Sequence, residues 1–378
     1  MTKALQKLPD PKAVLKWIKS NVVLFIAILA AIITSFIVKP DERYLEYFDF
    51  KTLSCLFCVL AVVCALRNIG FFYTMAREIV RRFKNAKVAV LALVYITFIG
   101  SMLIANDMAL LTFLPLGYFI LHTTKKEKYL AFTFIMQNIA ANLGGMLTPF
   151  GNPQNLYLYS KFNIPDGEFV SIMLPPFLVS ILLITLCCLV FIKSEKLEIE
   201  EEPLNIPMGR VVIYLILFAI SIMIVFRFMH FLVGLIIIPI ALLFLDRKAL
   251  LQVDYSLLFT FVFFFIFEGN MGRIDAERDF FSYLLNINTL VFSALSCQVI
   301  SNVPSAILLS QFTDNYRELL LGVNIGGAGT IIASLASLIT FKNYMKRDPD
   351  NIGSYMLRFS IFNFGFLIIL TAFCLIIL

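Results

Sequence analysis

Long runs of apolar residues, separated by short polar segments, dominate the pattern along this chain. A helix that crosses a bilayer needs about 20 such residues to span a hydrocarbon core of about 30 Å. The apolar runs, together with the Gly, Pro and charged residues that break them, predict nine membrane-spanning helices. Their ranges are 21–38, 52–66, 129–160, 168–193, 208–227, 229–245, 255–268, 319–341 and 356–378.

Two further apolar segments carry a polar break in the middle and charged residues at their ends. Segment 88–121 contains "ANDM", and segment 286–312 contains "SNVPS". We expect each to fold as a re-entrant helical hairpin whose tip lies at membrane depth. A full crossing at either segment would place every later loop on the opposite side of the membrane.

The distribution of charge supports this topology. Lys and Arg concentrate in the cytoplasmic loops of membrane proteins. With the N-terminus in the cytoplasm, most of the 31 Lys and Arg residues fall on the cytoplasmic side. Basic loops also account for the net charge of +6, so we expect no nucleic-acid partner. Only 15% of the residues are charged, and 60% are hydrophobic, as expected for a multi-pass protein of the cell inner (plasma) membrane.

The order of elements occurs twice. From residue 52, and again from 255, a span precedes an amphipathic stretch, a hairpin, an interrupted span and a terminal span, and the two copies have opposite orientation. "NLGGMLTPFGNPQNL" (142–156) aligns without a gap with "NIGGAGTIIASLASL" (324–338). Inverted repeats of this kind are typical of secondary transporters. The predicted division is a cytoplasmic N-terminal segment (1–20), a first transmembrane repeat (21–193), a linker with a connecting span (194–228) and a second inverted repeat (229–378).

Gly and Pro residues interrupt one span in each copy. Backbone that leaves a helix inside a bilayer loses hydrogen bonds at a cost of several kcal/mol per group, unless protein or water surrounds it. We therefore expect an all-α fold in which spans 129–160 and 319–341 are discontinuous and line a site. Half-helix N-termini suit anions, and unwound carbonyls suit cations. The candidate binding residues are Thr148, Gly151, Asn152, Pro153, Gln154 and Asn155 in the first break, and Asn324, Gly327, Thr330 and Ser334 in the second.

These polar residues have an alternative role, since they could simply cap helix ends and bridge neighbouring helices. The polar "GNPQN" of the first break has no counterpart in "ASLAS" of the second. We therefore expect substrate discrimination on the side of the first repeat.

The hairpin tips supply the remaining candidates. Asp107 would be costly as a charge at membrane depth without a partner. It could bind a coupling Na⁺, carry a proton, or cap a helix. The second tip has an amide where the first has this acid, so carboxylate-dependent coupling would be asymmetric. The candidates are Asn106 and Asp107 at the first tip, and Ser301, Asn302, Pro304 and Ser305 at the second.

The other charged and reactive residues in the sequence do not indicate a catalytic, phosphate-binding or metal-binding site. Arg67 and Glu268 lie at equivalent repeat positions near span ends, where snorkelling or a structural ion pair is the simpler interpretation. The two histidines, His122 and His230, have no metal-ligand spacing, and there is no phosphate-binding loop or Ser/His/Asp arrangement. We therefore expect that the protein is not an enzyme, has no cofactor and binds no metal other than a coupling Na⁺, with H⁺ as the alternative coupling ion.

Four motifs carry a resemblance to a known group. "NDMALLTFLP", "TPFGNPQNL", "SNVPSAILL" and "GVNIGGAGTIIASLASLI" are similar to the ion transporter superfamily, which includes anion permeases, citrate-transporter-like proteins, arsenite permeases and divalent anion/sodium symporters. The resemblance implies two inverted repeats around a central site, a homodimer and an elevator-like movement. In dicarboxylate/sodium symporters each tip carries a Ser-Asn-Thr motif, and neither tip of this chain has it. The chain thus departs from the family pattern that goes with dicarboxylate specificity and sodium coupling.

The leading hypothesis is a secondary active transporter of a small anion, a carboxylate or an oxyanion, coupled to Na⁺ or H⁺. Arsenite or antimonite efflux and Na⁺/H⁺ antiport are alternatives within the same class. A passive channel and a membrane-embedded enzyme are alternatives from other classes, and the channel could reuse the same broken helices.

Overall fold

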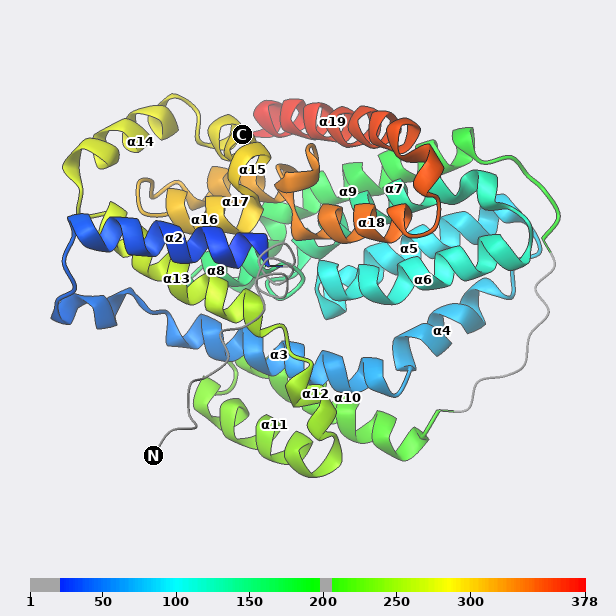
Figure 1. Ribbon diagram of the computed structural model, residues 1–378, viewed down its shortest axis with the longest axis horizontal. Coiled ribbons are helices and arrows are strands. Elements are labelled where there is room, and N and C mark those ends of the chain that lie inside the picture. Colours follow the sequence, from blue (N-terminus) through cyan, green and yellow to red (C-terminus); the bar gives the residue numbers. More distant parts are fainter. Residues whose placement is uncertain (1–20, 198–205) are drawn as a thin grey trace, which may run out of the picture. The chain divides into compact units, whose positions relative to one another are not determined.

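The computed structural model describes residues 21–197 and 206–378, apart from the side chains of Val22 and residues 275–278. This part of the chain is helical, with one isolated antiparallel bridge between Asn85 and Lys196 (Figure 1). The predicted all-α fold is therefore confirmed. The predicted cytoplasmic segment 1–20 lies outside the described residues.

Contacts divide the chain into two compact units. Of the described residues, the smaller unit comprises those up to Asp49 together with Asp254–Arg278, and the larger comprises those in Phe50–Val253 and Asp279–Leu378. In the smaller unit, α2 (Val22–Ile37) packs on α13 (Tyr255–Met271), and the 3-10 helix η1 (Glu42–Tyr47) also contacts α13. This division by contacts differs from the division into sequence repeats, which stays a prediction.

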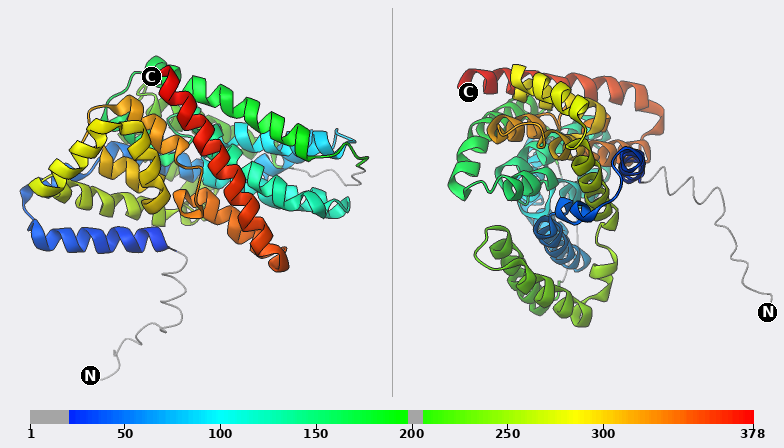
Figure 2. Two further views of the ribbon diagram at one scale, coloured as in Figure 1. Left: turned by 90° about the horizontal axis from the view of Figure 1, so that it is seen from above. Right: turned by 90° about the vertical axis from the view of Figure 1, so that its left-hand side faces the viewer.

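The larger unit contains the remaining helices, and the boundary between the units falls within α14. In chain order they are α3 (Phe50–Asn68), α4 (Phe71–Val80), α5 (Ala86–Ile104), α6 (Asn106–Thr123), η2 (Glu127–Tyr129), α7 (Leu130–Gly144), η3 (Gly145–Leu147), α8 (Pro153–Lys161), α9 (Asp166–Phe191), α10 (Met208–Val225), α11 (Phe231–Leu245), α12 (Arg247–Leu251), α14 (Asp275–Ile287), α15 (Thr289–Ile300), α16 (Asn302–Leu309), α17 (Tyr316–Ile325), η4 (Ile331–Ala333), α18 (Leu335–Met345), η5 (Pro349–Asn351) and α19 (Ile352–Ile377). Within this unit α19 packs against α7 and α9 (Figure 2).

Apolar length identifies fewer crossings than the sequence pattern does. In the described part of the chain, six helices are long and apolar enough to cross a bilayer alone, and three shorter apolar helices accompany them. The six include α5, which was predicted as half of a hairpin. They do not include the segment 319–341, because α17 and α18 are separate short helices. The nine-span count and the membrane depth of the tips stay predictions.

Both hairpins turn at a single residue with the same unusual backbone. Ala105 joins α5 to α6 with φ 66° and ψ 150°, and Ser301 joins α15 to α16 with φ 75° and ψ 159°. This region of backbone space favours glycine and costs other residues about 1–3 kcal/mol. In each tip the following Asn accepts a hydrogen bond at 3.0 Å from the next backbone N–H, Asp107 N to Asn106 Oδ1 and Val303 N to Asn302 Oδ1.

Both predicted discontinuous helices are interrupted, and the interruptions match. The first separates α7 from α8, which begins after Asn152, and the second separates α17 from α18, which begins after Ser334. The gap-free alignment of the two sequences pairs these two residues. Thr148 Oγ1 donates to Met102 O of α5 (2.7 Å), and the aligned Thr330 Oγ1 donates to Gln298 O of α15 (3.1 Å). These equivalent contacts support an internal repeat, while its inverted orientation stays a prediction.

Candidate functional site

Four amide side chains join the two interruptions at the centre of the larger unit. Asn324 Oδ1 accepts from Asn152 Nδ2 (3.1 Å) and from Gln154 Nε2 (3.4 Å). Asn324 Nδ2 in turn donates to Asn155 Oδ1 (2.6 Å). All four side chains are at most 1% exposed. We call Asn152, Gln154, Asn155 and Asn324 the amide hub.

The amide N–H groups of the hub donate to acceptors of the protein itself. Asn324 Nδ2 also donates to the carbonyl of Leu320 (2.8 Å), and Asn152 Nδ2 donates to the carbonyl of Asn142 (3.2 Å). The Asn155 amide donates to three carbonyls of the first interruption. With the amide nitrogens facing acceptors, each side-chain oxygen must point the other way.

Two acceptor oxygens of the hub remain unpaired. Asn152 Oδ1 and Gln154 Oε1 are buried and have no hydrogen-bond partner among the described residues. A buried polar atom left without a partner costs about 1–3 kcal/mol. The hub can therefore still bind a hydrogen-bond donor or a cation, because these two amide oxygens can accept a hydrogen bond but cannot donate one.

The first hairpin tip joins the hub through the first interruption. The backbone N–H of Asn106 donates to Gly151 O (3.1 Å), and Asn106 Nδ2 contacts Asn142 Oδ1 (3.3 Å). Asp107 follows in the first turn of α6 and is half-buried. The three roles predicted for Asp107 remain open at this position.

The second tip approaches the same place through Gly327. A Cβ atom added to Gly327 would lie 3.3 Å from Asn302 Nδ2 and 3.5 Å from Asn142 Oδ1. Ser301 Oγ donates to the carbonyl of Ala333 (3.3 Å), two residues before α18 begins. Both tips and both interruptions thus lie together, although more than half of the chain separates Asn106 from Ala333.

Helix ends of both polarities meet at this centre. α6, α8, α16 and α18 begin at a tip or an interruption, and α5, α7, α15 and α17 end there. The N-cap side chain caps only α18, where Ser334 Oγ accepts from Ser337 N (3.2 Å), and the N-cap residues of α6, α8 and α16 make no such bond. Helix N-termini carry partial positive charge and favour anions.

Some predicted candidates make contacts outside the hub. Thr330 bonds to Gln298 of α15, and Ser305 Oγ lies 2.8 Å from Ser296 Oγ. Pro153 occupies the first turn of α8, and Pro304 is buried within α16. These residues support the two helical breaks, and a direct binding role for them stays a prediction.

The sequence analysis missed a second group of buried polar residues next to the hub. Asn138 Nδ2 donates to Ser337 Oγ and to Asn363 Oδ1, both at 3.2 Å. Asn142 accepts from Asn106 and donates to the carbonyl of Asn138. An Asn pair four residues apart on one face of apolar α7 was the available signal. Nothing local marked Asn363, which lies in the last helix.

Arg67 also lies closer to the first tip than the sequence analysis implied. Its Nη1 atom is 3.2 Å from Met108 Sδ in the first turn of α6. Among the described residues of the larger unit, no carboxylate lies within ion-pair distance of Arg67. The interpretation of Arg67 as half of a structural ion pair finds no partner there.

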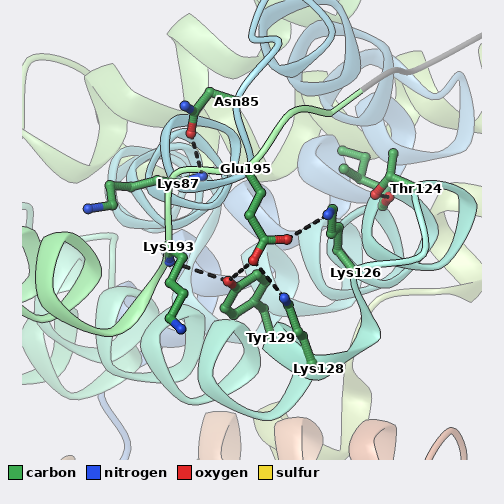
Figure 3. Close-up of polar contacts among 9 residues, drawn as sticks. Asn85, Lys87, Thr124, Lys126, Lys128, Tyr129, Lys193 and Glu195 are labelled. Atoms are coloured by element: carbon green, nitrogen blue, oxygen red, sulfur yellow. Dashed lines mark hydrogen bonds and ion pairs between the residues drawn. The ribbon is translucent and has the colours of Figure 1, made fainter.

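A separate ionic cluster fastens the chain after α9. Glu195 accepts from Lys126 Nζ (2.5 Å), Lys128 Nζ (2.6 Å) and Tyr129 OH (2.8 Å), as Figure 3 shows. Hydrogen bonds from Lys126, then Lys128 and Tyr129, lower the pKa of Glu195 to about 2. The Asn85–Lys196 bridge lies beside this cluster. The bridge ties the segment after α9 to the start of α5, and the cluster around Glu195 ties the same segment to the turn between α6 and α7.

The described residues include no group of three His, Cys, Asp or Glu side chains that could hold a metal ion. None of the seven cysteines forms a disulfide with another described residue; all lie in helices, and six are buried. The site is thus built from neutral amides, hydroxyls, backbone and helix ends, with Asp107 and Arg67 as its nearby charges.

Comparison with known proteins identifies the family. A model of the citrate transporter family matches residues 13–316. An uncharacterized transporter of Methanocaldococcus jannaschii is 32% identical over 93% of this chain and 96% of its own length. An inner membrane protein of Escherichia coli is 28% identical over 78% of this chain and 80% of its own length. A silicon efflux transporter of rice is 28% identical over 40% of this chain and 31% of its own length.

These matches agree with the predicted class, a multi-span membrane protein that transports a small solute. The family model covers both tips and the first interruption, and it ends at the start of α17, before the second interruption. The family match covers well over half of the chain. The chain belongs to the citrate transporter family of membrane transporters.

Proposed function

We propose that the protein is a secondary active transporter that moves a small anion, a carboxylate or an oxyanion, and couples this movement to Na⁺ or H⁺. The observation that carries the proposal is the amide hub, in which two interrupted helices meet beside two hairpin tips. At membrane depth such breaks are tolerated where protein buries them or where they line a cavity, and secondary transporters form their binding sites at broken helices of this kind.

The coupling cation would bind at the unpaired oxygens of the hub. Asn152 Oδ1 and Gln154 Oε1 are neutral and do not titrate, so they suit a bound Na⁺ better than a carried proton. Proton coupling would instead require Asp107, the acid in the first turn of α6. The anion would bind at the uncapped N-termini of α6, α8 and α16.

Several finer features of the proposal follow from the same contacts. The hub ties the first break to the second, and both breaks contact a hairpin, so these elements would move together in an elevator-like step. We further propose a homodimer in the inner (plasma) membrane with a cytoplasmic N-terminus. The equivalent backbone of the two tips supports the internal repeat, and such a movement would further require the two copies to be inverted.

Efflux of a neutral hydroxylated solute, such as arsenite or antimonite in its protonated form, is a second candidate. Hydroxyl groups would donate to the same two unpaired oxygens of the hub, without any cation. The rice relative, which is named a silicon efflux transporter, covers part of the chain. Na⁺/H⁺ antiport is a third candidate, and it depends on titration of Asp107.

Uptake into proteoliposomes tests the proposal. We expect saturable accumulation of citrate or sulfate, driven by an imposed Na⁺ or pH gradient, and no gradient-driven accumulation of arsenite. Uptake that merely equilibrates would indicate a channel. Accumulation of arsenite alone would support the second candidate instead.

The variant Asp107→Asn separates the two coupling ions. If Na⁺ drives transport through the hub, Asp107→Asn should keep Na⁺-driven uptake and lose any response to a pH gradient. Gln154→Ala should lower the apparent Na⁺ affinity, because it removes one of the two unpaired oxygens. Na⁺-driven uptake with unchanged Na⁺ affinity in Gln154→Ala would contradict the assignment of the cation to the hub.

A further inference from the structure

We propose that Arg67 binds the transported anion at the first hairpin tip, a role that rests on the proposed transport of an anion. Arg67 lies in the last turn of α3, outside both interruptions. Its guanidinium would contact a carboxylate or oxyanion that also lies at the N-terminus of α6. Nothing in the family match or the relatives assigns a role to this side chain.

Position is the first argument. Nη1 of Arg67 lies 3.2 Å from Sδ of Met108, and Met108 is 5% exposed. Met108 is two residues after Asn106, whose N–H and side chain join the first interruption. The guanidinium therefore adjoins the same helical turn that links the tip to the amide hub.

The second argument is the unused hydrogen-bonding capacity of Arg67. A guanidinium has five N–H donors, and a thioether sulfur is a weak acceptor. Two other arginines of the larger unit have stronger partners. Arg81 pairs with Glu78 (2.6 Å), and Arg227 lies over the ring of Tyr159 while donating to its carbonyl (2.8 Å). Within the described residues of that unit, Arg67 has neither a carboxylate nor a ring beside it.

The donors that an anion requires make the third argument. The amide N–H groups of the hub are already bonded to acceptors, and its two unpaired atoms are oxygens, which repel an anion. At the N-terminus of α6 the N–H groups of Asn106 and Asp107 already donate, to Gly151 O and Asn106 Oδ1, so the guanidinium of Arg67 is the strongest remaining donor near the first tip. Arginine matches carboxylates and oxyanions with two parallel hydrogen bonds, and these charge-assisted bonds are among the strongest in proteins.

The cost of placing an arginine there supports the same conclusion. Arg67 is half-buried at the end of an apolar helix, where a charge is expensive and is retained mostly for function. Snorkelling to the membrane surface is the competing explanation. It predicts no effect of a bound anion on Arg67, so the two explanations differ in a measurable way.

Chemical labelling of the purified full-length protein tests the proposal directly. Phenylglyoxal modifies accessible arginines, and mass spectrometry follows each site separately. We expect citrate or sulfate to slow the modification of Arg67 several-fold while modification of Arg81 in the same sample is unchanged. Equal labelling of Arg67 with and without both anions would overturn the proposal.

Two variants supply the second readout. In proteoliposomes, Arg67→Gln should raise the KM for the transported anion by about 10- to 100-fold, the range expected for a lost charge-assisted hydrogen bond. Arg67→Lys keeps the charge and should fall between this variant and the wild type. Both should keep the wild-type melting temperature, because Arg67 has no ion pair in the larger unit to lose.

The outcomes separate this proposal from the proposed function. If the wild type accumulates an anion and Arg67→Gln keeps its KM, then Arg67 is not a ligand and anion transport still stands. If neither citrate nor sulfate is accumulated by the wild type or protects Arg67, both proposals fail. If Arg67→Gln lowers the melting temperature but leaves the KM unchanged, Arg67 has a structural role and does not bind the anion.

Discussion

Replacement of Asn324 by Ala would remove the centre of the amide hub. Asn324 accepts from Asn152 and Gln154 and donates to Asn155. Asn152 Nδ2 would keep its bond to the Asn142 carbonyl. Gln154 Nε2 and Asn155 Oδ1 would lose the side-chain partner that the structure gives them.

The size of the effect follows from these two orphaned groups. Each buried polar atom that loses its partner costs about 1–3 kcal/mol, so we expect destabilisation of about 2–6 kcal/mol. A change of 1 kcal/mol shifts the melting temperature of a large domain by about 2–4 °C. The Asn324→Ala variant should therefore melt at least about 4 °C below the wild type.

A thiol-reactive fluorescent dye suits this measurement. Six of the seven cysteines are buried, so the dye reacts as the protein unfolds. Asn343→Ala is a control, because the Asn343 side chain bonds only to residues one helical turn away: its Nδ2 donates to Ile339 O (3.0 Å), and its Oδ1 accepts from Arg347 Nη1 (3.1 Å), which also donates to the Asn343 backbone carbonyl (3.0 Å). Its melting temperature should change by no more than about 2 °C, as is usual for a half-exposed position. Equal shifts in the two variants would refute the idea that the hub holds the two interruptions together.

Two further predictions concern positions on either side of the hub. Gly327→Ala would place a methyl group 3.3 Å from Asn302 Nδ2 and 3.5 Å from Asn142 Oδ1. We expect a large loss of transport with only a small fall in melting temperature, measured by uptake and dye assays on the same preparation. Glu195 has a pKa of about 2 in the folded protein against about 4.3 in the unfolded chain, so its contribution to stability is present above about pH 5 and is lost as the pH falls toward 2. Glu195→Gln should lower the melting temperature at pH 7 and should flatten its decline between pH 5 and 3, whereas an unchanged decline would mean that the pairing with Lys126 contributes nothing.

Local chemistry explains why much of the fold could be predicted. Apolar runs such as 168–193 predicted a helix, and α9 covers Asp166–Phe191. Clustered Gly and Pro residues predicted the break before α8, because proline lacks an N–H donor and glycine weakens a helix. The same argument located the break before α18. These signals lie within a few residues of the structure that they determine.

Features that depend on distant partners could not be predicted in this way. Asn363 bonds to Asn138 across more than half of the chain, and no local pattern pairs the two. The partners of Glu195 lie in the turn between α6 and α7, and the sequence pattern gave no register for them. The number of crossings depends on the bilayer as well as on apolar length. Such contacts are decided by tertiary packing.

The two interruptions share a backbone plan but differ in chemistry. The alignment pairs Asn152 with Ser334, Gln154 with Ala336, and Asn155 with Ser337. In the second copy Ser334 Oγ and Ser337 Oγ bond to each other (2.9 Å), and Ser337 also accepts from Asn138.

The aligned serines of the second copy therefore have partners, whereas the first copy presents amides toward Asn324 and keeps two buried oxygens without a partner among the described residues. Because an unpaired buried group is stabilised by whatever ligand satisfies it, binding specificity is expected where those groups are. This asymmetry gives a physical reason for placing substrate and ion discrimination in the first repeat. Ser334 and Ser337 then hold the second interruption in the shape that brings Asn324 to the hub.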